Sequence, residues 1–226
     1  MLHRLLRGLV PALAAFTLLA APMAHAQSES QSVINDARQT LADLRHNPEF
    51  GTAAQAMRHA RAVVIIPHLY KGGFIVGGSG GVGVMMVQAR NGTWSNPAFY
   101  AIGSASFGLQ IGLERSEMVL LVMTQKGLNG LLQDSFKLGA SAGIAVVALG
   151  SSVEGALAGP NPPDIVVWSA NIGAYGGLTL EGSILRPQPD HDRAWYGRPL
   201  TTRDILFGRF AYPPATALRE EIQSIG

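Results

Sequence analysis

The stretch KGGFIVGGSGGVGV, from Lys71 to Val84, decides how the middle of this chain folds, because two functional motifs overlap in it. The spacing matches the G-x-G-x-x-G of a dinucleotide-binding turn at Gly78, Gly80 and Gly83, and the G-x-S-x-G of a hydrolase nucleophile elbow at Gly77, Ser79 and Gly81. Both motifs require a helix directly after the glycines. Here VGVMMV and then Asn91-Gly92 follow, which predicts a strand that runs into a two-residue type I′ hairpin turn.

Neither motif is accompanied by the other residues that its chemistry needs. No acidic residue lies about 20 positions beyond the glycines to bind a ribose, and Lys71 precedes the glycines, whereas the lysine of a phosphate-binding loop follows them. Ser79, Asp164 and His191 do occur in the chain order of a hydrolase triad. An exported serine hydrolase therefore stays an alternative to be tested.

Most of the 27 glycines lie between Gly72 and Gly182, among Val, Ile, Leu, Phe and Tyr, and this texture predicts antiparallel β-structure. Glycine at this density inside strands implies strong curvature or close approach of backbones. The expected strands are 62–66, 74–77, 82–89, 104–113, 118–124, 136–148, 165–170 and 175–185, with a short helix at 126–133. The predicted fold class is α+β, with a curved glycine-rich antiparallel β-sheet or partial barrel flanked by N- and C-terminal helices.

Apolar residues recur at helical spacing at both ends of this β region. A first helix is predicted over 32–45, a second after Asn47 and Pro48, and a third over about 214–224. The first helix pairs an apolar stripe with a polar face of mixed sign, and the stripe contains neither Trp nor Phe. This pattern favours packing on the domain over a position on a membrane surface, although membrane contact stays open.

The first 26 residues predict a secretory signal peptide, because Arg4 and Arg7 precede an apolar stretch that ends in Ala24-His25-Ala26. The mature chain is then expected to begin at Gln27, and residues 27–226 to form a single domain. We expect an exported protein, periplasmic or associated with the outer envelope.

Charge and cysteine content exclude several classes of binding partner and covalent link. Without Arg4 and Arg7 the 17 Lys and Arg become 15, which equals the 15 Asp and Glu, so the mature chain has no broad positive field and nucleic acid is not expected as a partner. Cysteine is absent, which excludes disulfides and a lipid-bearing cysteine after the signal. The segment Asp190-His191-Asp192 follows two prolines and is interpreted as a solvated loop, so no metal site, cofactor or catalytic residue is predicted.

Five segments, taken together and in this order, resemble the SYLF domain family over about residues 32–223. They are ARAVVIIPHLYKGGFIVGGSGGVGVMMVQ, NGTWSNPAFYAIGSASFGLQIGLERSEMVLLV, FKLGASAGIAVVALG, LTLEGSIL and WYGRPLTTRDIL. The resemblance implies binding of phospholipids, particularly phosphoinositides, in eukaryotic members, and of actin in a fungal branch. It also implies that the glycine run is a strand-and-turn feature without a nucleotide or catalytic role.

Our hypothesis from the sequence is a non-enzymatic, exported protein that peripherally binds phospholipid at a membrane surface through anionic or phosphoinositide-type head groups. Cations near apolar edges can bind phosphates while their stems contact acyl chains. The candidate lipid-binding residues are Lys71, Lys126, Lys137, Arg115, Arg38 and Arg45. The alternative is a structural or protein-interaction domain without lipid affinity, whose partner is an envelope protein.

Overall fold

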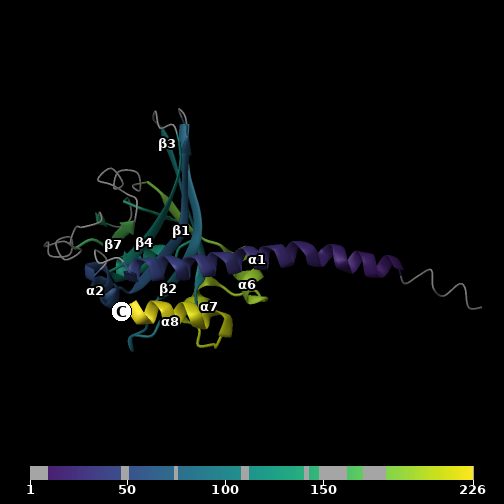
Figure 1. Cartoon of the computed structure of the whole chain (residues 1–226). Coiled ribbons are helices and arrows are strands. Elements are labelled where there is room, and N and C mark those ends of the chain that lie inside the picture. Colours follow the sequence, from purple (N-terminus) through teal and green to yellow (C-terminus); the bar gives the residue numbers. More distant parts are fainter. Residues whose placement is uncertain are drawn as a thin grey trace, which may run out of the picture.

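One eight-stranded sheet organises the chain, and helices from both ends of the sequence pack against it (Figure 1). The computed structural model describes residues 10–46, 51–73, 76–107, 112–139, 143–147, 162–169 and 182–225. The strands are β1 Ala62–Gly73, β2 Val76–Val87, β3 Ala98–Phe107, β4 Gly112–Val122, β5 Phe136–Lys137, β6 Ile144–Val147, β7 Ile165–Ser169 and β8 Ile184–Pro187. The helices are α1 Val10–His46, α2 Gly51–His59, α3 Gln125–Leu131, α6 Pro189–Tyr196, α7 Thr202–Phe207 and α8 Thr216–Ile225, with a 3₁₀ turn η2 at Pro213–Ala215.

The strand order is β5-β8-β3-β2-β1-β4-β7-β6, and every described pairing is antiparallel except that of β6 with β7. This confirms the predicted α+β class with a glycine-rich sheet between terminal helices. Figure 1 shows β1, β2 and β3 rising away from the layer formed by α1 and α8. One cluster of buried apolar side chains includes residues of α1, the sheet and α8.

Several predicted strand boundaries were wrong. The expected strands 74–77 and 82–89 are one strand, β2, so the glycines lie inside a strand and not at a turn. The expected strand 104–113 spans the end of β3 and the start of β4, and 136–148 contains two short strands. Residues 74–75, 108–111, 140–142, 148 and 170–181, on which parts of these predictions and of the expected strands 165–170 and 175–185 fall, lie outside the described residues.

The glycines of β2 are required by a bulge in β1. From Ile65 to Tyr70, β1 advances five residues while β2 advances only four, from Val84 to Gly80. Pro67 lies within this bulge, where its missing N–H costs no ladder hydrogen bond. The bulge brings carbonyls of β1 over β2: a Cβ at Gly83 would lie 1.9 Å from the Ile65 oxygen, and one at Gly81 2.3 Å from the His68 oxygen. Only glycine permits this approach.

The predicted hairpin turn after β2 exists, but its type I′ assignment was wrong. The Gly92 N–H donates to the Ala89 carbonyl at 2.9 Å, so Arg90 and Asn91 are the central residues of the turn. Gly92 has φ +82°, whereas no described residue other than glycine has a positive φ. Asn91 instead uses its side-chain oxygen to accept from the Thr93 N–H at 3.2 Å. The turn therefore relies on one left-handed glycine.

The helices at both ends follow their predicted apolar stripes. In α1 the stripe of Ile34, Ala37, Leu41 and Leu44 is fully buried, so this face packs on the domain, as the sequence favoured. α1 also extends through Ala26, so the expected signal cleavage position lies inside a continuous helix, while residues 1–9 lie outside the described ones. Among the described helices, none combines the length and apolar character needed to span a bilayer.

The interpretation of Asp190-His191-Asp192 as a solvated loop was wrong, because these residues belong to α6. Pro189 occupies the first turn of the helix, and Gly197 ends it in the left-handed conformation. Asp192 is completely buried, and its Oδ1 accepts from the Phe99 N–H of β3 at 2.9 Å, while its Oδ2 has no hydrogen-bond partner. Burial raises the pKa of Asp192 to about 7, although the Phe99 hydrogen bond opposes the rise.

Gly83→Ala is expected to destabilise the protein by roughly 3 kcal/mol or to prevent folding, because its methyl group would overlap the Ile65 carbonyl. Gly103→Ala in β3 is the matched control, since its Cβ would meet only the Ser79 oxygen at 3.8 Å. Thermal unfolding of both variants checks this expectation. Equal stability of the two would contradict the close approach of β1 to β2.

Asp192→Asn is expected to change how stability depends on pH. Because the folded-state pKa lies above the unfolded value, folded Asp192 keeps a proton that the unfolded chain releases between about pH 4 and pH 7. The wild type should therefore lose stability relative to Asp192→Asn as pH rises through this window, by on the order of 4 kcal/mol, and level off above it.

Urea unfolding across this range measures the difference, with exposed Asp190→Asn in the same helix as the control. A difference between wild type and Asp192→Asn that is constant with pH would show that Asp192 is ionised throughout.

Candidate functional site

A single row of paired residues crosses six strands and joins two of the predicted lipid-binding cations. Directly paired residues of neighbouring strands point to the same face of a sheet. From β4 to β5 the row consists of Arg115, Tyr70, Gly80, Gly103, Ile184 and Lys137. We call it the cross-strand row. Its two cations stand at the ends, and two glycines lie in the middle.

The row is open to solvent. Arg115 and Lys137 are exposed, and Tyr70 is 48% exposed, whereas Gly103 and Ile184 are half-buried. Strands lie about 4.8 Å apart, so the two end strands of the row are separated by about 24 Å when measured along the sheet. A surface this wide is too large for one small ligand and suits an extended contact.

One further cation on this face was missed by the sequence analysis. Arg186 pairs with Ala101 and stands two residues from Ile184 on β8, so it is on the face of the row, and it is exposed. The predicted strand ended at residue 185. Alternation about the buried Leu185 is the signal that would have placed Arg186 on the same side as Ile184.

Arg115 is held in place by a histidine that also contacts α1. The Arg115 Nε donates to His68 Nδ1 at 3.0 Å, and a second guanidinium nitrogen lies 3.1 Å from His68 Nε2. His68 Nε2 lies 3.2 Å from a carboxylate oxygen of Asp36. The guanidinium is thereby oriented beside Glu117, where burial raises the pKa of the Glu117 carboxyl and the Arg115 charge opposes the rise.

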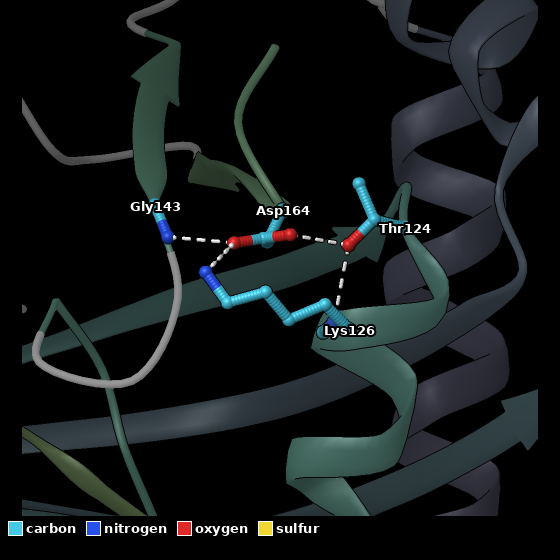
Figure 2. Close-up of polar contacts among 5 residues, drawn as sticks. Thr124, Lys126, Gly143 and Asp164 are labelled. Carbon is cyan, nitrogen blue, oxygen red and sulfur yellow. Dashed lines mark hydrogen bonds and ion pairs between the residues drawn. The ribbon is translucent and has the colours of Figure 1, made fainter. Parts of the chain in front are cut away.

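Lys126 belongs to a separate polar cluster around Asp164, shown in Figure 2. Lys126 Nζ and the Gly143 N–H approach one carboxylate oxygen at 3.2 and 2.9 Å, and the Thr124 hydroxyl donates to the other. The same Thr124 oxygen accepts from the Gly127 N–H at 3.1 Å and caps α3. The cluster therefore joins the start of α3 to the segments before β6 and β7.

The Asp164 cluster controls the protonation of its carboxyl group. Burial alone would raise the pKa of Asp164, but the hydrogen bonds from Thr124, Gly143 and Lys126 outweigh burial and hold the pKa below its ordinary value. The Lys126 side chain is still 69% exposed. The geometry assigns the cluster a structural role, with Lys126 as its outermost member.

The remaining predicted cations do not join the row. Lys71 follows Tyr70 and pairs with Ser79 and Glu114, so it is on the opposite face of β1. Arg38 is half-buried on α1. Arg45 forms an ion pair with Glu221 at 3.5 Å and thereby links α1 to α8. The structure thus places Arg115 and Lys137 on one face, at opposite ends of the row, and leaves the other four at separate places.

The serine hydrolase alternative lacks an assembled triad. Ser79 lies within β2, and its hydroxyl is 2.7 Å from that of Ser104. Asp164 is engaged in the cluster of Figure 2. His191 Nδ1 lies 3.1 Å from the hydroxyl of buried Ser30, and its ring stacks on Phe99. The three residues have different partners, and Ser79 is not at a strand-to-helix turn.

Comparison with known proteins gives a family match and several relatives. Residues 103–225 match the family described as "Ysc84: Las17-binding protein actin regulator". The chain is 28% identical over 182 residues to "SH3 domain-containing YSC84-like protein 1" of Homo sapiens, and the aligned region covers 80% of this chain and 52% of that protein. It is 30% identical over 162 residues to "LAS seventeen-binding protein 3" of Saccharomyces cerevisiae, and the aligned region covers 70% of this chain and 35% of that protein.

The chain therefore spans about half the length of the human relative and about a third of the yeast one. No solved structure matches it.

Asp164→Ala is expected to destabilise the protein by about 3 kcal/mol near neutral pH, because it leaves the Gly143 N–H and the Thr124 hydroxyl without their acceptor. Lys126→Ala should cost less than about 1 kcal/mol, because its ion pair is largely solvated.

Because the pKa of Asp164 is lower in the folded protein than in the unfolded chain, ionised Asp164 stabilises the fold above the unfolded-chain pKa near 4. This stabilisation is lost as pH falls through the folded-state pKa. The deficit of Asp164→Ala should therefore shrink in acid. Denaturant unfolding at neutral and acidic pH measures it, and a larger cost for Lys126→Ala than for Asp164→Ala would contradict the structural role.

Proposed function

Because this chain belongs to the Ysc84 family, in which the SYLF resemblance placed it, we propose that it is a non-enzymatic binding protein that attaches peripherally to anionic phospholipid surfaces of the cell envelope. The proposed contact surface is the cross-strand row together with Arg186. Its exported location follows from the predicted signal peptide.

The single observation that carries this proposal is the arrangement of the row. Two cations at its ends lie on one exposed face with an aromatic ring between them, and no bulky side chain stands at its centre. Tyrosine suits the head-group region, because its ring is apolar and its hydroxyl is polar, while Arg and Lys bind lipid phosphates. The width of about 24 Å allows contact with several head groups at once.

Charge sets the strength of this interaction. The predicted mature chain has equal numbers of acidic and basic residues, so attraction to the membrane comes from a few local cations and not from a broad field. Each cation near an anionic membrane surface contributes about 1 kcal/mol, and salt screens this contribution within about 10 Å. Binding is therefore weak and sensitive to salt.

Protein binding without lipid affinity is the second candidate. The family description and the yeast relative's name refer to Las17 binding, and the human relative carries an SH3 domain by name. Those names describe proteins that are much longer than this chain. Under this second candidate, the glycine-rich face of the row is a docking surface for an envelope protein.

Co-sedimentation with vesicles tests the proposal. The full chain is mixed with vesicles of phosphatidylcholine alone or with phosphatidylglycerol, at low and high salt. Neutral vesicles measure any attachment by the apolar N-terminal segment. We expect additional binding to anionic vesicles at low salt, and Arg115→Gln/Lys137→Gln should weaken it by tenfold or more, about 2 kcal/mol in total.

Arg58→Gln/Arg90→Gln is the matched control, since it removes the same charge from exposed positions outside the row and should change binding about twofold at most. Absence of charge-dependent sedimentation in the wild type would exclude the lipid proposal and favour the protein-binding candidate. Equal losses in the two double variants would show that net charge acts and not the row.

A further inference from the structure

A second exposed surface combines an aromatic ring with arginines, and the sequence analysis assigned none of its residues. Phe207, at the end of α7, is 50% exposed, and together with Tyr70 it makes up the large hydrophobic side chains exposed in the described part of the chain. The segment 198–210, to which Phe207 belongs, also contains cations. We call this surface the arginine–phenylalanine patch. Its members are Arg198, Arg203, Phe207, Arg209 and Phe210.

Charge in this segment is strongly one-sided. Residues 198–210 contain three arginines and a single acid, Asp204. The Asp204 carboxylate accepts from the backbone and hydroxyl of Thr201 in a capping box, so it is directed to the start of α7. None of the three arginines forms an ion pair with a described acidic residue. Their charge is thus available to an anionic partner.

The patch is held rigidly by the body of the protein. Arg203 and Phe207 are four residues apart on α7 and are therefore neighbours on one helical face. The Arg198 guanidinium lies 4.7 Å from the centre of the Phe210 ring, a cation–π contact that leaves its edge N–H groups free. The Asn96 side chain donates to the Phe210 carbonyl at 3.0 Å, which fixes the loop after α7. The backbone of the patch is therefore anchored before binding, while the exposed arginine side chains become ordered on binding.

From this arrangement we propose that the arginine–phenylalanine patch is a second membrane-contact surface, in which Phe207 enters the interface of an anionic bilayer and the three arginines bind its phosphates. The inference rests on the proposed lipid-binding function and adds a separate contact. Charge complementarity selects an anionic surface, and the exposed phenyl ring selects one with an apolar layer beneath the charges. An acidic segment of a partner protein is the competing occupant, and it is favoured if anionic vesicles leave the emission of Phe207→Trp unchanged.

Tryptophan at either exposed aromatic position reports on membrane contact. Trp94, Trp168 and Trp195 are 6%, 3% and 2% exposed, so they supply a constant buried background that the wild type measures. Phe207→Trp and Tyr70→Trp are made separately in the full chain and mixed with phosphatidylcholine vesicles with and without phosphatidylglycerol. We expect the emission of Phe207→Trp to shift to shorter wavelength with anionic vesicles only.

Binding variants complete the experiment. Phe207→Ser should weaken sedimentation with anionic vesicles about tenfold, and Arg203→Gln and Arg209→Gln about fivefold each. The unfolding midpoint of Phe207→Ser should stay near that of the wild type, since its ring is half exposed.

The outcomes separate the two surfaces. An emission shift of Phe207→Trp, together with weaker binding of Phe207→Ser, supports the patch. An emission shift of Phe207→Trp without one of Tyr70→Trp moves lipid contact from the row to the patch. A shift of Tyr70→Trp alone, with Phe207→Ser binding as the wild type does, overturns the patch as a membrane surface and leaves the proposed function intact. Absence of anionic binding in all proteins overturns both.

Discussion

The close approach of β1 to β2 is the constraint on which the rest of the fold depends. A residue with a Cβ at position 83 would overlap the Ile65 carbonyl, and one at position 81 would overlap that of His68. The bulge around Pro67 creates this contact, and it also changes the alternation of β1. Beyond the bulge Tyr70 pairs with both Gly80 and Arg115, so Tyr70 lies on the face that carries Arg115 and Lys71 lies on the opposite face. One extra residue in one strand thus decides which side chains form the exposed row.

The polar contacts divide the cations into those that hold the structure and those that remain available. Lys126 and Arg45 form ion pairs with Asp164 and Glu221 and join separate elements. Arg115 is oriented by His68, which also contacts Asp36 of α1, and the Arg115 side chain is exposed. Binding by a nearly neutral chain therefore comes from a small set of local side chains, which makes their placement more important than net charge.

Local sequence patterns predicted the helices and strands whose apolar periodicity and end signals lie within a short stretch of the chain. The helices α3 and α8 and the strand β7 were predicted close to their observed bounds, and so was the C-terminal end of α1, whereas its start at Val10 lies far before the predicted residue 32. The error at α6 was of another kind, because Pro189 at the first turn, acids beside it and Gly197 after it are helix signals that two prolines obscured. The hairpin after β2 shows the same limit: Asn91-Gly92 indicates a turn, while the surrounding hydrogen bonds select its type.

Composition and periodicity determined that this chain forms a glycine-rich sheet between amphipathic helices, because these signals are carried by residues near one another along the chain. The tertiary structure decided which cations share a face. Arg115 and Lys137 belong to strands at the two ends of the row, and their placement on one face depends on five strand pairings and a bulge. Burial of Asp192 and exposure of Phe207 likewise depend on how α6 and α7 pack. Periodicity records which residue types alternate, but only packing decides which of them remain in contact with water.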